Sequence, residues 1–172
     1  MRSKLLIFLC VFVITMDAQE LTEYFYKTAE VITKNKSFKK KLNKCLGAGS
    51  LYLEDTLNTS YGSTVFTNEI SHADTNILNA LNNYINLEKE ISNSLESKQR
   101  SIIHSSKFKQ YFSQTGKIHV TYSYFYENLI KIEFRRYRGK KDPWETSQEF
   151  SALFYFKKDG ELTYYTTCLT MH

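Results

Sequence analysis

The chain has 172 residues, of which 42% are hydrophobic and 24% are charged, and its formal net charge is +5. This length suits one domain with a buried core, and a single proline with no low-complexity tract argues against a linker between two domains. The excess of positive charge is too small for a dedicated nucleic-acid-binding protein, so we expect no nucleic-acid partner.

Residues 1–18 have the pattern of a secretory signal peptide. Arg2 and Lys4 supply positive charge, an apolar run covers residues 5–14, and the segment ends at the small residue Ala18. The apolar run is about half as long as the roughly 20 residues that a membrane-spanning helix needs. The sequence therefore predicts cleavage after Ala18, a secreted or periplasmic location, and a mature domain of residues 19–172 without a transmembrane segment.

The mature domain is expected to begin with helices. Apolar residues recur every three or four positions over residues 20–46, with a break at Asn35-Lys36-Ser37 where Ser37 is predicted to cap a second helix. Gly47 and Gly49 end this helix. Residues 50–70 predict a hairpin of two short strands.

A long helix and then a shorter one are expected next. Ser71 to Asp74 has the spacing of a helix start, and one apolar face then runs from Ile77 to Leu95. A second helical piece is predicted over residues 101–112, ending before Gly116. We expect both pieces to pack on the sheet that follows.

From Lys117 the apolar period changes to two, which predicts four strands. Strands near residues 118–126 and 130–135 are separated by a tight turn at Glu127-Asn128. Strands over residues 150–156 and 162–171 are joined by a turn that contains Asp159-Gly160. The short connections predict an antiparallel meander.

The predicted fold class is α+β, with N-terminal helices packed on a curved four-stranded antiparallel meander. This element order resembles that of NTF2-like cone folds, and cystatin-like folds share a helix packed on a curved antiparallel sheet. The resemblance rests on element order, and no family motif is present from which functional residues could be transferred.

Cys45 and Cys168 are the cysteines that remain after cleavage. An oxidising compartment favours a disulfide between them, which would close a very long loop. The alternative is two separate buried thiols. With no CxxC motif and no pair of histidines nearby, we expect no metal site and no cofactor.

The two faces of the predicted sheet differ in composition. One face is apolar and is expected to pack against the helices. The opposite face is mixed and carries His119, Thr121, Phe125, Lys131, Glu133, Arg135, Leu153, Tyr155, Tyr165, Leu169 and Met171. Aromatic residues beside charges favour a pocket or an interface, so Tyr155, Tyr165, Arg135 and Phe125 are candidate binding residues. The alternative is that residues 42–70 cover this face as ordinary core.

His119 and Glu133 are the candidate catalytic residues. If their strands align, the carboxylate would orient the imidazole for acid–base chemistry. A histidine that faces a glutamate on a sheet is also common without catalysis, and the chain has no Gly-rich phosphate loop, GxSxG elbow or paired-carboxylate signature.

Two basic clusters are present. One covers residues 135–141 with Trp144 close behind, and the other places six lysines between Lys34 and Lys44. Basic residues among aromatics can hold phosphate or an acidic glycan, whereas most charge runs are simply solvated. Both interpretations remain open at this point.

These observations favour an exported, non-catalytic domain that binds a small ligand or a protein partner through the open face of its sheet. One alternative is a small cone-fold pocket enzyme (a hydrolase, isomerase or dehydratase) that uses His119 as its base. Another is a periplasmic immunity or inhibitor protein that blocks a partner's active site. A deep cavity with His119 at its floor would favour the enzyme, and a flat aromatic face would favour the binding protein.

Overall fold

The computed structural model describes residues 19–58, 75, 77–80, 93–126, 128–136, 148–157 and 161–170. Several predictions lie outside these residues: the signal peptide, the second strand of the expected hairpin, the helix start at Ser71 to Asp74 and the middle of the long helix. In the described part of the chain, no helix is both long enough and apolar enough to cross a membrane.

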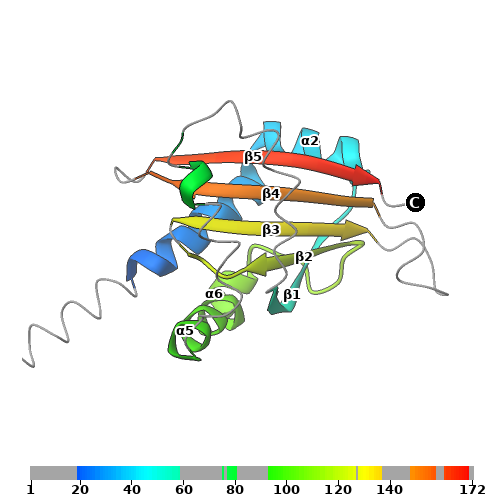
Figure 1. Ribbon diagram of the computed structural model, residues 1–172. Helices are drawn as coiled ribbons and strands as arrows, with labels where there is room; N and C mark the ends of the chain where they lie inside the picture. Colours follow the sequence, from blue (N-terminus) through cyan, green and yellow to red (C-terminus); the bar gives the residue numbers. More distant parts are fainter. Residues whose placement is uncertain are drawn as a thin grey trace, which may run out of the picture.

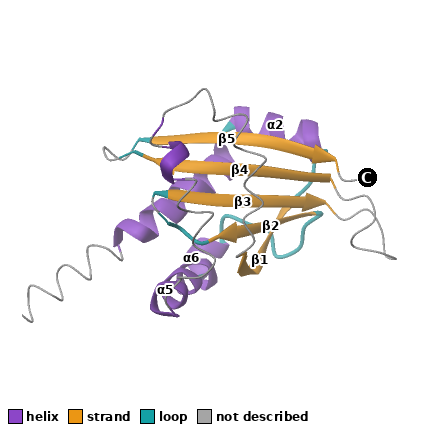
Figure 2. Cartoon of the chain, in the orientation of Figure 1, coloured by secondary structure: helices purple, strands orange, loops and turns teal. Residues whose placement is uncertain are grey.

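Helices and a five-stranded mixed sheet make up the described chain (Figures 1 and 2), which confirms the predicted α+β class. The strands lie across the sheet in chain order: β1 (Leu51–Asn58), β2 (Ile118–Ser123), β3 (Leu129–Arg136), β4 (Gln148–Phe156) and β5 (Leu162–Thr170). Each neighbouring pair from β2 to β5 is antiparallel, whereas β1 lies parallel to β2. The sheet therefore has one more strand than expected, because the segment predicted to start a hairpin pairs instead with β2.

Two N-terminal helices pack on one side of the sheet. They cover residues 19–34 and α2 (Lys36–Leu46). The predicted break is present, but the cap is Asn35 rather than Ser37, because the Asn35 side chain accepts a hydrogen bond from the Phe38 amide at 3.0 Å. The helix ends at Gly47, whose φ of 76° is readily adopted only by glycine.

The next helices differ from the prediction at their bounds. They are α5 (Asn93–His104) and α6 (Ser106–Lys109), separated at Ser105. The Ser105 hydroxyl accepts a hydrogen bond from the Phe108 amide at 3.2 Å and so caps α6. Gln99 of α5 is buried and bonds the backbone of Phe125 twice, accepting from its N–H at 2.6 Å and donating to its carbonyl at 3.1 Å. This pair of bonds fixes α5 at the end of β2.

The main core lies between the N-terminal helices and the apolar face of the sheet. Phe38 of α2 is at its centre, and its ring centroid lies 5.5–5.9 Å from those of four aromatic residues, Phe134, Phe150, Phe154 and Tyr164. The predicted apolar face is thereby confirmed. Two of its residues, Leu162 and Tyr164, are half-buried against the core, and the others are buried there: Ile118, Val120, Tyr122, Ile130, Ile132, Phe134, Phe150, Ala152 and Phe154.

Gly116 lies against the start of β1. A Cβ atom at Gly116 would lie 2.7 Å from the carbonyl oxygen of Ser50 and 2.8 Å from the amide nitrogen of Tyr52. Because both are backbone atoms, no side-chain rotation relieves the clash. We expect Gly116→Ala to lower the free energy of unfolding by about 1–3 kcal/mol in chemical denaturation.

Gly49→Ala is the matched control for this substitution. A Cβ atom at Gly49 would meet only side-chain atoms of Ile118 and Lys117, at 3.3 Å or more. Equal losses of stability in the two variants would contradict the role assigned to Gly116.

Candidate functional site

Most of the predicted site residues lie on the face of the sheet opposite the N-terminal helices, which we call the front face. The strand register places Arg135 opposite both His119 and Glu149, and it places Glu133 opposite Thr121 and Ser151. Directly paired residues point to the same side of a sheet. These side chains from β2, β3 and β4 therefore share one surface.

Four charged residues form a continuous chain of ion pairs on the front face. Lys131 Nζ lies 2.7 Å from Glu133 Oε1, Arg135 Nη2 lies 3.0 Å from Glu133 Oε2, and Arg135 Nε lies 3.2 Å from Glu149 Oε2. We call Lys131, Glu133, Arg135 and Glu149 the charged row. Lys131, Glu133 and Glu149 are buried, whereas the Arg135 side chain is 31% exposed. Because positive and negative charges alternate, each buried charge has an opposite partner.

His119 sits beside the charged row but has a different carboxylate partner from the one expected. Its Nδ1 atom contacts Oε1 of Glu54, and its ring meets the Tyr52 ring edge-on with centroids 5.2 Å apart. The β1 register puts Tyr52 directly beside His119, so Glu54 follows two positions later on the same face. Glu133 is instead held by Lys131 and Arg135.

Sequence reasoning missed Tyr52 and Glu54. Both alternate with the apolar residues Leu51 and Leu53, so their place on one strand face was readable from the sequence. The strand that pairs with theirs could not be read from the sequence, because this segment was expected to pair within its own hairpin.

Tyr155 and Tyr165 lie on the front face, as predicted, and both are half-buried. They pack around a small second core of Ile77, Ala80, Leu129 and Leu153. Figure 1 shows the helical segment that contains residues 77–80, in green, in front of the sheet. Residues 77–80 thus contribute cover to part of this face, while the described parts of the 42–70 segment form the end of α2 and β1.

The predicted position of Phe125 on the front face is wrong. Its ring stacks on Tyr24 with centroids 4.9 Å apart and lies 6.2 Å from the ring of Phe156, on the helix side of the sheet. The strand alternation stops because β2 ends at Ser123, and Gln99 then holds the Phe125 backbone. Phe125 therefore belongs to the edge of the main core.

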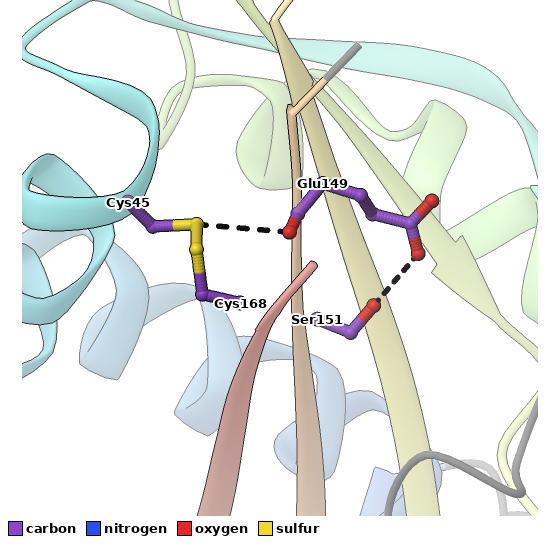
Figure 3. Close-up of a disulfide and its surroundings, with 4 residues drawn as sticks. All are labelled: Cys45, Glu149, Ser151 and Cys168. Carbon is purple, nitrogen blue, oxygen red and sulfur yellow. Dashed lines mark hydrogen bonds between the residues drawn. A yellow bond between two sulfur atoms is a disulfide. The ribbon is translucent and has the colours of Figure 1, made fainter. Parts of the chain in front are cut away.

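The structure supports the predicted disulfide between Cys45 and Cys168, whose Cα atoms lie 5.9 Å apart. Figure 3 shows it joining α2 to β5 beside the backbone of Glu149. The Cys45 sulfur lies 3.6 Å from the Glu149 carbonyl oxygen, and this is a plain contact because a disulfide sulfur has no hydrogen to donate. The Glu149 carboxylate points to the other side of β4, where the Ser151 hydroxyl donates to it at 3.0 Å.

Two of the hollows border other parts of the described chain, and the first reaches the His119 site only through Tyr52. One of about 200 Å³ lies between β1 and α6 and includes Tyr52 and the Lys109–Asp55 ion pair of 2.7 Å. The other, of about 430 Å³, lies between Tyr26 and Tyr111. Neither is lined by His119 or Glu133. Among the described residues, no group of three or more His, Cys, Asp or Glu side chains is placed to hold a metal ion.

The fold and the candidate site together define a class: a disulfide-linked α+β domain with a row of paired charges on one sheet face. No family model, no curated protein and no solved structure matches the chain. Function therefore has to be argued from the chemistry of this face.

Proposed function

We propose that this protein is an exported, non-catalytic domain that binds a small ligand or a protein partner through the front face of its sheet. The observation that supports this most directly is the exposed surface around Arg135, where His119 and Glu54 lie beside the charged row. There the side chains of Arg135, His119 and Glu54 are 31%, 29% and 32% exposed, whereas Lys131 and Glu133 beside them are only 5–6% exposed. Polar side chains that are exposed to solvent but fixed by buried neighbours are suited to binding a ligand or partner.

Arg135 is the central residue of this surface. Its Nε and Nη2 atoms are engaged by Glu149 and Glu133, so the plane of the guanidinium is fixed before any partner arrives. Among the described contacts Nη1 has no carboxylate partner and could meet an acceptor on a ligand. A preorganised side chain loses less entropy on binding than a mobile one.

Export is part of the same proposal. It rests on the signal-like pattern of residues 1–18 and on the disulfide, since disulfides persist mainly in oxidising compartments. We also propose that the helices and strands β2 to β5 form a cone fold of the NTF2-like or cystatin-like type.

A second candidate function is acid–base catalysis at His119. The contact between His119 Nδ1 and Glu54 favours it, because a carboxylate on one ring nitrogen orients the other nitrogen for proton transfer. The corresponding enzyme would be a hydrolase, isomerase or dehydratase. The binding function is preferred because Arg135, held by Glu133 and Glu149, gives the front face a preorganised hydrogen-bond donor.

The front face is tested by screening a set of small amines, carboxylic acids and phenols by NMR against the exported protein labelled with ¹⁵N. Bound compounds are expected to shift the amide signals of Arg135, Tyr155 and Tyr165. Replacing either tyrosine by leucine keeps an apolar group against Leu153, so the melting temperature should change little. Binding should weaken by about 30-fold, since truncating an anchoring aromatic costs about 2 kcal/mol.

Tyr111→Leu is the matched control, because it removes another half-buried tyrosine far from the front face. It should leave binding unchanged. Shifts that gather elsewhere, or a large fall in the melting temperature of both the Tyr155 and Tyr165 variants, would end the binding-face proposal.

A further inference from the structure

Helix α2 carries an unusual concentration of positive charge. Its lysines are all exposed, and it has no acidic residue: Lys36, Lys39, Lys40, Lys41 and Lys44. Several lysines elsewhere on the surface pair with carboxylates, as in Lys27–Glu23, Lys34–Glu30 and Lys157–Glu161. Within the described chain no carboxylate pairs with any α2 lysine. Lys40 also follows Lys36 and precedes Lys44 by four positions, a spacing at which like charges destabilise a helix.

Among the described residues, strand β5 is an edge strand without the usual protection. Its sequence, LTYYTTCLT, contains neither a charge nor a proline, and it pairs only with β4 among the described strands. Natural edge strands are usually blocked by lysines, prolines, bulges or a covering segment, because their outward N–H and C=O groups can pair with another chain. The opposite edge is protected in this way: the Ser113 amide donates to the Leu51 carbonyl of β1 at 2.8 Å.

The basic helix lies along this edge. The disulfide ties Cys45 of α2 to Cys168 of β5, and Lys41 Nζ lies 5.7 Å from the centre of the Tyr164 ring. Figure 1 shows α2 behind β5 and extending past the edge of the sheet. An additional strand beside β5 would therefore run along α2, with every second side chain directed to the helix side.

We propose that the β5 edge binds an extended acidic segment of a partner protein as an added strand. Backbone hydrogen bonds to β5 would hold the segment, and its alternate acidic side chains would lie against the α2 lysines. A second copy of this chain fits less well, since a twofold β5–β5 pairing would bring two lysine-rich helices together on the same side of the joined sheet. This surface is separate from the front face.

The test uses a fluorescent peptide of alternating glutamate and valine, added to the exported protein. Fluorescence anisotropy should report binding that weakens with added salt, and hydrogen exchange of the β5 amides should slow. The same peptide with alternate amide nitrogens methylated keeps its charge but cannot pair fully as a strand. It should bind at least about tenfold more weakly.

Charge reversal on α2 supplies the second measurement. Lys40→Glu with Lys44→Glu should weaken peptide binding at least about tenfold. Lys98→Glu with Lys117→Glu is the matched control, because both residues are exposed, carry no described ion pair and change the net charge equally. This control should change binding by no more than about twofold.

Any one of five results would overturn the proposal. The first is that the peptide does not bind, and the second is that the methylated peptide binds as tightly as the parent peptide. The third is that the two charge-reversed variants lose binding equally, which would indicate attraction by net charge alone. The fourth is that binding of anionic lipid vesicles or of an acidic glycan requires the α2 lysines while binding of the peptide does not. The fifth is that the β5 amides become protected by self-association without any peptide.

Discussion

Glu133→Ala is expected to lower the free energy of unfolding by about 3–5 kcal/mol. Glu133 accepts charged hydrogen bonds from Lys131 at 2.7 Å and from Arg135 at 3.0 Å. The side chains of Lys131 and Glu133 are only 5% and 6% exposed. Without Glu133, the ammonium group of Lys131 would remain buried with no described carboxylate beside it, and a buried unpaired charge is far more costly than a missing contact. Chemical denaturation measures the loss.

Glu161→Ala is the matched control. It removes the carboxylate of another lysine–glutamate pair, Lys157–Glu161, whose side chains are 41% and 59% exposed. Solvent already screens this pair, so the loss should stay below about 1 kcal/mol. Replacing the buried pair as a unit, with Lys131→Met and Glu133→Leu, should cost less than Glu133→Ala alone because no orphaned charge remains. Similar small losses for the two alanine variants would show that the charged row is not buried in solution.

The strands from β2 to β5 and their apolar face could be predicted from the sequence because the information is local. Alternation of apolar residues fixes which side chains point to the helices, and short connections bring successive strands together. The turn at Asn128 is an example: its φ is 67°, a value that asparagine tolerates better than most residues, and Tyr126 and Leu129 exchange hydrogen bonds of 3.0 and 2.8 Å around it.

The pairing of β1 could not be predicted from local sequence. Its partner β2 lies far along the chain, and parallel pairing requires a long crossover rather than a turn. The alternation of Leu51 and Leu53 with Tyr52 and Glu54 indicates a strand but not its neighbour. The His119–Glu54 contact depends on that neighbour, so it could not be identified.

The burial of the charged row is also a property of tertiary structure. Alternation places Lys131, Glu133 and Arg135 on one face, and the sequence gives no reason to expect lysine to be buried there. In the structure, Lys131 and Glu133 pair along their own strand while Glu149 reaches Arg135 from β4. The pairing satisfies the buried charges, and this depends on the register of β3 with β4.

Removing the disulfide, by Cys45→Ser together with Cys168→Ser, is expected to lower the free energy of unfolding by about 4–5 kcal/mol. The bond joins residues separated by 123 positions, so it strongly restricts the unfolded chain. The native fold should persist, because Phe38, Leu42 and Leu46 still bury the inner face of α2. The effect should therefore appear as lower stability with the native secondary structure retained.

Two further observations separate this unfolded-state effect from damage to the native packing. The dependence of the unfolding free energy on denaturant should become steeper in the double variant, because its unfolded state exposes more surface. Reductant should bring the stability of the unmodified protein close to that of the variant and should leave the variant unchanged. If reductant does not alter the unmodified protein, or if alkylation under denaturing, non-reducing conditions labels both Cys45 and Cys168, the two cysteines are not joined, and α2 is held to β4 and β5 by its apolar face alone.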